Sequence, residues 1–184
     1  MTCYIVRHGQ DDETVRGGWS DHSLIPEGIA QVHALGRQMQ EKGLKISCIY
    51  SSDIQRAKQT AGILEAYLHC PVELTPGFRE SNNGYLAGMK HALAEEKYPG
   101  VYWNTLEYTQ CWPGGESPEQ FFYRVREAWQ ELKRTLKDTE EDVLLVTHGG
   151  VLEAILCMEK GVTFTNKQKH FQTPCATLFA IEVK

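Results

Sequence analysis

The chain of 184 residues lacks an excess of positive charge. It carries 19 lysines and arginines against 24 aspartates and glutamates, which gives a formal net charge of -5 at pH 7. A surface with this balance does not attract nucleic acid or an anionic membrane as a whole. We therefore expect no nucleic-acid partner, and any site for an anionic substrate must gather its cations locally.

Long apolar runs are also missing. No segment reaches the roughly 18–20 consecutive apolar residues that a membrane helix needs. The N-terminus shows no basic stretch followed by the apolar core of a signal peptide. We expect no membrane association and a cytoplasmic location.

Closely spaced cysteine pairs are absent. The sequence contains 6 cysteines, none in a C-x-x-C pair, and no acidic cluster has the spacing of metal ligands. We therefore predict no metal and no cofactor. Cys3, Cys48 and Cys157 lie inside apolar runs, as buried free thiols do, which fits a reducing cytoplasm.

What is present is the pattern of one α/β domain spanning residues 1–184. Short apolar runs alternate with segments of helical periodicity. The expected strands are 3–6, 46–50, 71–74, 143–147 and 176–183, and the expected helices are 26–42, from Ser52 to about 68, 90–97, 117–137 and 151–158. The alternation predicts right-handed βαβ units, and hence a three-layer sandwich with a mostly parallel central sheet and helices on both faces.

Two serines match the capping box that begins a helix. Ser52 is followed three residues later by Gln55, and Ser117 by Gln120, with Pro118 between them at the first helical position. Between 75 and 115 the periodicity fades into glycines, asparagines, prolines and aromatics. A long irregular stretch of this kind is typical of a lid or a functional loop.

Histidine and arginine side chains follow three of the predicted strands. Residues 7–9 (RHG) follow the first strand, Arg56 lies near the start of the helix after the second, and residues 148–150 (HGG) follow VLLVT. Taken singly, His8 could be a polar loop residue, Arg56 a solvated arginine, and His148 a strand-end histidine bonded to a backbone carbonyl. Because ligands bind beyond the carboxyl ends of parallel strands, we expect the three segments to meet at one site.

Such a group of side chains suits phosphoryl transfer. The transferred group spreads negative charge over three oxygens and needs fixed cations, which Arg7 and Arg56 can supply through paired hydrogen bonds. A neutral imidazole can attack phosphorus, and a carboxyl group on a loop can protonate the leaving oxygen.

Four segments resemble motifs of the histidine phosphatase superfamily, the phosphoglycerate-mutase-like group, in order along nearly the whole chain. Residues 7–9 resemble its RHG signature, and 51–61 (SSDIQRAKQTA) resemble its S-S-D-x-x-R-A-x-x-T-A segment. Residues 113–117 (PGGES) resemble its P-x-G-E-S turn, and 147–150 (THGG) its second histidine motif.

The resemblance implies a role for each residue. His8 is implied to be the nucleophile that becomes a phosphohistidine, while Arg7, Arg56 and His148 hold the phosphoryl group. Glu80 falls where the family places its proton donor. The chemistry agrees, because nearby arginines favour the neutral imidazole that attack requires. We expect five further residues to line the substrate-binding site: Gln10, Trp19, Ser81, Asn82 and Gly149.

Departures from the mutase pattern favour a phosphatase. In mutases the proton donor is followed by an arginine and a tyrosine that bind the substrate. In this chain Glu80 is followed instead by residues 81–83 (SNN). The segment between His8 and Asp21 is shorter than usual, Thr14 being the nearest counterpart of the family's asparagine, and the paired arginines of the mutase insert are missing before Pro113.

Cations are also scarce in the region where a mutase would hold its bisphosphate. Between Glu80 and Ser117 the only candidate cations are Lys90, His91 and Lys97. Fewer cations favour release of the dephosphorylated product and attack by water. We therefore predict a metal-independent phosphomonoesterase that hydrolyses a small phosphorylated metabolite through a phosphohistidine.

Other functions remain as alternatives. The chain could be a cofactor-dependent phosphoglycerate mutase, a non-catalytic domain that binds a phosphorylated ligand, or a scaffold that acts through its surface. Five aromatic residues could line a pocket for the organic part of a substrate or pack a lid onto the core: Trp19, Tyr85, Tyr102, Trp103 and Trp112.

Overall fold

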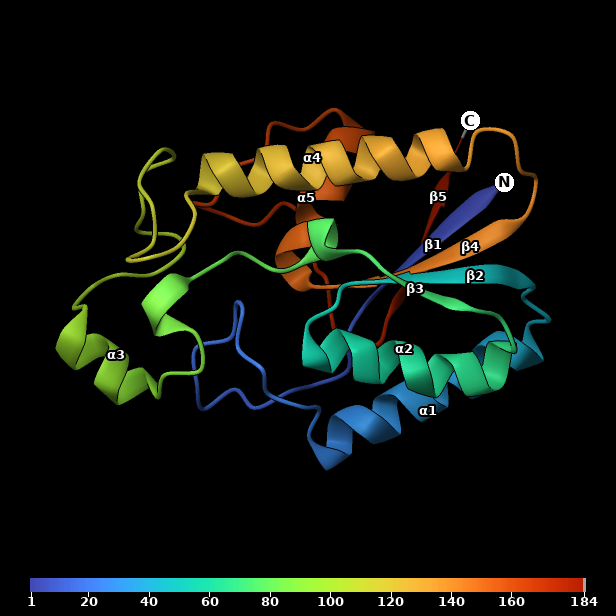
Figure 1. Ribbon diagram of the computed structural model, residues 1–184, viewed down its shortest axis with the longest axis horizontal. Helices are drawn as coiled ribbons and strands as arrows, with labels where there is room; N and C mark the ends of the chain where they lie inside the picture. The colour runs from blue at the N-terminus through green and yellow to red at the C-terminus, as the bar shows by residue number, and fades with distance from the viewer. Residues whose placement is uncertain (184) are drawn as a thin grey trace.

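A computed structural model describes residues 1–183 and contains a five-stranded sheet in the order β3-β2-β4-β1-β5 (Figure 1). Its strands are β1 (Thr2–Arg7), β2 (Ile46–Ser51), β3 (Val72–Leu74), β4 (Asp142–Thr147) and β5 (Leu178–Glu182). β1 to β4 run parallel, and β5 pairs antiparallel with β1 at the edge. The predicted fold class, an α/β sandwich with a mostly parallel sheet, is confirmed.

Helices cover both faces of this sheet. They are α1 (Pro26–Glu41), α2 (Gln55–Leu68), α3 (His91–Lys97), α4 (Pro118–Thr135) and α5 (Gly149–Lys160), with short 3₁₀ turns η1 (Pro76–Phe78) and η2 (Gly84–Leu86). α1 and α2 pack on one face and α4 and α5 on the other (Figure 1). None of the helices in the described part of the chain is long and apolar enough to span a membrane.

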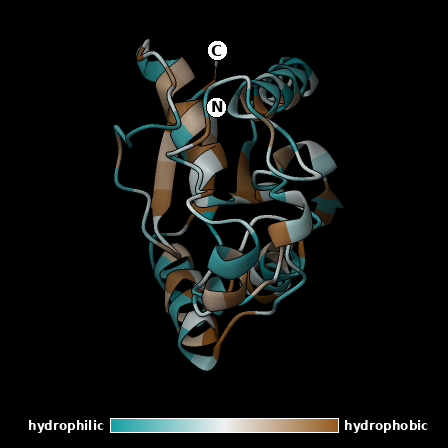
Figure 2. Ribbon diagram, turned by 90° about the vertical axis from the view of Figure 1, so that its left-hand side faces the viewer, coloured by the Kyte–Doolittle hydropathy of each residue, from teal (hydrophilic) through white to brown (hydrophobic). Residues whose placement is uncertain are grey.

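The alternation of side chains along each strand divides the core in two. Ile5 and Leu145 are fully buried against α4 and α5, whereas their neighbours Val6 and Leu144 are fully buried against α1 and α2. Figure 2 shows the strands as largely hydrophobic and the helices as striped. The apolar runs that indicated strands are continuous because helices cover both faces of the sheet.

One predicted capping box is confirmed and the other is wrong. At α4 the Ser117 hydroxyl accepts a hydrogen bond from the Gln120 N–H, and the Gln120 side chain accepts one from the Ser117 N–H. α2 instead begins at Gln55 after Ile54, without a side-chain cap. The Ser52 hydroxyl lies 2.8 Å from a ring nitrogen of His148, so this serine belongs to the site rather than to a capping box.

Several predicted boundaries shift by one to three residues. α4 ends at Thr135 rather than 137, and β5 covers Leu178–Glu182 rather than 176–183. α5 begins at Gly149, two residues before the predicted 151, so the helix starts directly after His148. The early start matters because it brings the first N–H groups of α5 to the carboxyl end of β4.

The region 75–115 contains η1, η2 and α3 and packs around a hydrophobic cluster of its own. Leu86, Ala94, Leu106 and Trp112 are buried together in it. α3 lies beyond the carboxyl ends of the central strands (Figure 1). This region therefore covers the edge of the sheet at which the site was predicted.

Candidate active site

The strand register brings the predicted residues to one place. Arg7 of β1 pairs with Thr147 of β4, and the His8 N–H donates to the Thr147 carbonyl at 2.9 Å. His8 and His148 are 3% and 0% exposed. Their ring centroids lie 5.1 Å apart, so the two histidines that stand 140 positions apart form one buried centre.

Gly9 is needed because the chain passes close to α1. A Cβ at this position would lie 2.6 Å from the Gly28 carbonyl oxygen and 2.8 Å from a methyl group of Val32. The Gly9 N–H also donates to the Thr60 hydroxyl of α2 at 3.1 Å. The glycine of the RHG segment thus lets β1 end tightly between the two helices.

The hydrogen bonds of His8 define its tautomer. Its Nδ1 lies 2.7 Å from the Gly9 carbonyl oxygen, which can only accept, so Nδ1 carries the hydrogen. The Arg56 Nε–H, which can only donate, lies 3.1 Å from Nε2. Burial, followed by the charge of Arg56, holds the pKa of His8 well below its ordinary value. His8 is therefore a neutral imidazole with its lone pair on Nε2.

Arg56 is held from several sides at the start of α2. Its Nη2 donates to the Gly18 carbonyl at 2.8 Å and its Nη1 to the Ser20 carbonyl at 3.3 Å. Asp11 lies 3.4 Å from its Nε. Burial lowers the pKa of Arg56 and the Asp11 charge opposes that effect. Asp11 is thus a partner of the site that the sequence analysis missed.

His148 and Arg7 each present a buried nitrogen without a protein partner. The Nε2 of His148 lies 2.8 Å from the Ser52 hydroxyl, and burial holds its pKa well below the ordinary value. The Nδ1 of His148 and the Nε of Arg7 make no hydrogen bond to any residue in 1–183. Because buried polar atoms are almost always bonded, both nitrogens are available to a ligand.

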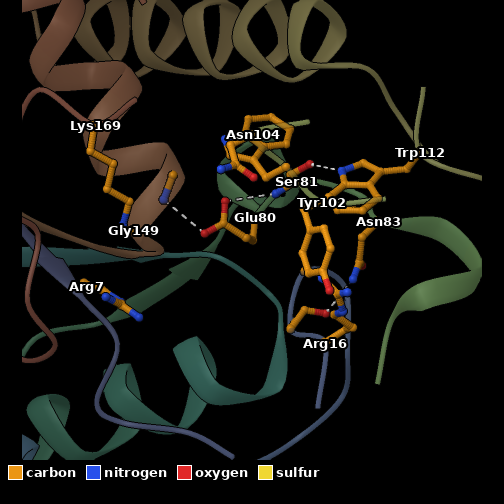
Figure 3. Close-up of a pocket in the computed structure, with 14 residues that line it drawn as sticks. Arg7, Arg16, Glu80, Ser81, Asn83, Tyr102, Asn104, Trp112, Gly149 and Lys169 are labelled. Atoms are coloured by element: carbon orange, nitrogen blue, oxygen red, sulfur yellow. Dashed lines mark hydrogen bonds between the residues drawn. The ribbon is translucent and has the colours of Figure 1, made fainter. Parts of the chain in front are cut away.

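Glu80 lies across from the start of α5. Its Oε2 accepts a hydrogen bond from the Gly150 N–H and its Oε1 one from the Ser81 N–H, both at 3.0 Å (Figure 3). The carboxyl group is therefore fixed at both oxygens and lines a cavity next to the histidine pair.

A clamp behind Glu80 fixes the loop that carries it. Arg124 of α4 donates to the Glu80 carbonyl at 3.1 Å and pairs with Glu116 at 2.6 Å. Glu116 also accepts the Asn82 N–H at 2.8 Å, and the Trp19 indole donates to the Glu80 carbonyl at 2.7 Å. The glutamate of the PGGES segment thus acts by holding the loop.

The cavity has a volume of about 400 Å³. It is lined by Arg7, Arg16, Gly17, Gly18, Glu80, Ser81, Asn83, Tyr102, Trp103, Asn104, Trp112, Gly149, Gly150 and Lys169. His8, Arg56 and His148 do not line it but are buried directly beside Arg7, Gly18 and Gly149. The five residues predicted to act on phosphate therefore lie in the lining of this cavity or directly beside it.

Two of the five predicted substrate-lining residues, Ser81 and Gly149, line the cavity. The other three do not, because their side chains serve the scaffold. Gln10 bonds to Gln31 of α1, the Trp19 indole supports Glu80 from behind, and the Asn82 side chain accepts the Gly84 N–H.

A model of the histidine phosphatase superfamily (branch 1) matches residues 3–183. The chain belongs to the histidine phosphatase superfamily. The resemblance predicted from four short motifs is thereby confirmed, and it extends over nearly the whole chain.

Relatives in the superfamily include both phosphatases and mutases. A metal-independent phosphoserine phosphatase from Arabidopsis thaliana is 31% identical over 158 residues, which cover 82% of this chain and 65% of that protein. A 2,3-bisphosphoglycerate-dependent phosphoglycerate mutase from Bartonella henselae is 31% identical over 172 residues, which cover 88% of this chain and 82% of that one. The predicted enzyme class, a phosphatase, is confirmed.

A solved structure shares the whole fold. Bacillus stearothermophilus YhfR superposes with a TM-score of 0.86 at 25% identity, covering 100% of this chain and 91% of that chain. This chain therefore shares the fold of that protein over its whole described length.

The cavity of this histidine phosphatase also contains residues that the sequence analysis did not single out. The main ones are Arg16, Asn83, Asn104 and Lys169. Of the aromatic candidates, Tyr102, Trp103 and Trp112 line the cavity, whereas Tyr85 is 68% exposed. The bridge between Val15 and Lys90 and the backbone hydrogen bonds of Arg16 to Gly88 and Met89 bring Arg16 to the region 75–115, and no local pattern signals these contacts.

Proposed function

We propose that this histidine phosphatase is a metal-independent phosphomonoesterase that hydrolyses a small phosphorylated metabolite through a phosphohistidine at His8. The observation that carries the proposal is the fixed tautomer of His8. Gly9 holds the hydrogen on Nδ1, and the lone pair on Nε2 is therefore ready to attack phosphorus.

The reaction has two steps. His8 Nε2 forms a bond to phosphorus while the bond between phosphorus and the leaving oxygen breaks, and Glu80 gives its proton to that oxygen. A water molecule then attacks the phosphohistidine, Glu80 takes its proton, and phosphate leaves with His8 regenerated. Arg56 must first transfer its hydrogen bond from Nε2 to a phosphoryl oxygen.

Three groups would hold the phosphoryl oxygens. Arg7 and Arg56 supply fixed positive charge, and Arg7 Nε has no other partner among residues 1–183. Donation from the Ser52 hydroxyl to His148 Nε2 would leave the hydrogen on Nδ1, the buried atom that lacks a partner. A neutral His148 would then donate to the phosphoryl group.

Mutase activity is the second candidate, and two observations favour it. One is the mutase among the relatives. The other is the presence of Arg16 and Lys169 in the cavity, because these cations come from outside residues 80–117, where they were judged scarce. The absence of the mutase arginine and tyrosine after Glu80 still supports the phosphatase.

Acid-quench trapping with a ³²P-labelled phosphomonoester tests the proposal. We expect a label that is acid-labile and alkali-stable, that maps to His8, and that is absent in His8→Ala. Phosphate release should persist in EDTA. Phosphate release without any label would reject the phosphohistidine, loss of activity in EDTA that Mg²⁺ restores would reject metal independence, and transfer to a second hydroxyl of the substrate in place of release would identify a mutase.

We also expect the enzyme to act in a reducing cytoplasm. All 6 cysteines are free thiols in the structure, and several of them are buried. Burial raises the pKa of Cys3 to about 12, which keeps this thiol protonated and unreactive.

A further inference from the structure

One end of the cavity holds a guanidinium group that the proposed chemistry does not use. Arg16 lines the cavity next to Tyr102, on the side away from Arg7 and Gly149 (Figure 3). Glu80 lies between the two ends. A substrate whose phosphate is held at the Arg7 end can therefore extend its organic part past Glu80 to Arg16.

Arg16 is buried, and two nitrogens of its guanidinium group have no hydrogen-bond partner among residues 1–183. The residue is 9% exposed, and its Nε and Nη2 atoms make no hydrogen bond to any residue of the described chain. None of the ion pairs formed within residues 1–183 includes it. Because a buried charged donor without an acceptor is costly, this arrangement suits an acceptor that enters the cavity.

The position of Arg16 is set before any ligand binds. Its backbone N–H donates to the Met89 carbonyl and its carbonyl accepts the Gly88 N–H, both at 2.8 Å. Its guanidinium carbon lies 4.1 Å from the centre of the Tyr102 ring, and the Tyr102 hydroxyl donates to Glu95 at 2.6 Å. The guanidinium group thus lies against the Tyr102 ring without forming an ion pair, and its Nε and Nη2 atoms have no partner in the described chain.

The charges around the cavity leave this end positive. Besides Arg16, the charged lining residues are Arg7, Lys169 and Glu80. Glu80 is occupied by two backbone N–H groups, and Lys169 lies on the Arg7 side (Figure 3). The nearby acid Glu95 is exposed and bonded to Tyr102 and to the Gly100 N–H, outside the cavity lining.

We propose that Arg16 is a specificity-determining residue that binds a second anionic group, a carboxylate or a second phosphate, on the alcohol part of the substrate. The planar fork of an arginine matches either group with two parallel hydrogen bonds. This inference rests on the proposed function, because it assigns the leaving alcohol of the same reaction.

Matched substrates test this assignment. 3-Phosphoglycerate and glycerol 3-phosphate share a carbon skeleton and differ in a carboxylate replaced by a hydroxymethyl group. We expect phosphate release from the wild-type enzyme to show a kcat/KM at least about tenfold higher for the carboxylate ester. A second pair consists of propane-1,3-diol bisphosphate and its monophosphate. A higher kcat/KM for the bisphosphate would identify a phosphate, rather than a carboxylate, as the group that Arg16 prefers.

Variants connect the preference to Arg16. In Arg16→Gln the ratio of kcat/KM values within the preferred pair should fall to near one, and Arg16→Lys should keep part of it. Arg37→Gln, at an exposed position of α1 away from the cavity, is the control and should keep the wild-type ratio. A purely structural role of Arg16 would lower both members of a pair equally and leave the ratio intact.

The outcomes separate this inference from the proposed function. Equal kcat/KM values within both pairs for the wild-type enzyme, or a ratio that survives Arg16→Gln, would overturn the role of Arg16. If Arg16→Gln does not fold, the wild-type ratio and Arg16→Lys decide. Failure of the wild-type enzyme to release phosphate from any of these esters or from p-nitrophenyl phosphate would reject the proposed function itself.

Discussion

The Gly150 N–H and the Glu80 carboxyl group are joined by a 3.0 Å hydrogen bond, and a side chain at position 150 would crowd this contact. A Cβ on Gly150 would lie 2.5 Å from Glu80 Oε1. A Cβ on the second glycine after His148 would therefore push the Glu80 carboxyl group, which faces it from a loop 70 positions earlier, away from its present position.

We expect Gly150→Ala to displace Glu80 and lower kcat/KM for an alkyl phosphate by about ten- to hundredfold, since misplacing a catalytic group by about 1 Å has effects of this order. Steady-state kinetics measure the loss. Gly62→Ala is the control, because a Cβ at this exposed position of α2 meets nothing within 4 Å. It should keep full activity and gain about 0.5–1 kcal/mol in the free energy of unfolding. Full activity in Gly150→Ala would contradict the constraint.

Replacing the carboxyl group of Glu80 should affect poor leaving groups most. Glu80→Gln is expected to lower kcat/KM for an alkyl phosphate by about a hundredfold or more, because the leaving alkoxide then lacks a proton donor. The loss for p-nitrophenyl phosphate should be much smaller. kcat/KM is the right quantity, because it excludes the later hydrolysis of the phosphohistidine. Equal losses for both esters would assign the proton to another group.

Because Arg124 of α4 holds the loop that carries Glu80, a substitution in this helix should change both stability and activity. Arg124→Lys keeps the charge but loses the fork that joins Glu116 to three backbone carbonyls. We expect a loss of about 1–3 kcal/mol in the free energy of unfolding, measured by urea denaturation. The activity loss should be larger for alkyl than for aryl phosphates, as for Glu80→Gln.

Arg126→Lys is the matched control for the clamp. Arg126 lies on the same helix, and its ion pair with Glu127 is exposed, with the two side chains 39% and 62% accessible. Exposed pairs contribute only about 0–1 kcal/mol. If Arg124→Lys behaves like Arg126→Lys in stability and in leaving-group dependence, the clamp has no positioning role.

Local sequence signals predicted the sheet and the meeting of His8, Arg56 and His148 at its edge. The runs before His8 and His148 are apolar because both faces of the sheet are covered, so strand and site positions could be inferred together. The capping box predicted at Ser52 is wrong because a serine three residues before a glutamine fits that pattern whether its hydroxyl caps a helix or bonds to a histidine. Local sequence cannot separate these uses.

The organic end of the cavity was much less predictable. Arg16 reaches it through backbone hydrogen bonds to Gly88 and Met89, a pairing of two irregular segments without periodicity. Trp19 and Asn82 were expected to touch substrate because they stand near the motifs, but each is turned to a scaffold contact. Whether the side chain of a loop residue points into the cavity is decided by tertiary contacts.

The buried histidines predict a loss of stability in mild acid. The pKa values of His8 and His148 in the folded protein lie well below the ordinary 6.5. Below about pH 6.5 the unfolded chain therefore binds protons that the folded chain does not, and each histidine lowers the free energy of unfolding by about 1.4 kcal/mol per pH unit. Above that pH both states are neutral at these positions, and their contribution is constant.

Urea denaturation between pH 5 and 8.5 measures this effect, and His8→Asn and His148→Asn isolate it. Each variant should differ from the wild type by a constant amount between about pH 7.5 and 8.5, whatever its packing defect, and should lose one histidine's share of the slope between about pH 6.5 and 5. The slope of the free energy of unfolding against pH is decisive because it reports the difference in bound protons between the two states and does not depend on the packing defect of the variant. An unchanged slope in both variants would mean that the two imidazoles take up protons in the folded protein over the same pH range as in the unfolded chain, which would contradict the lowered pKa values of His8 and His148.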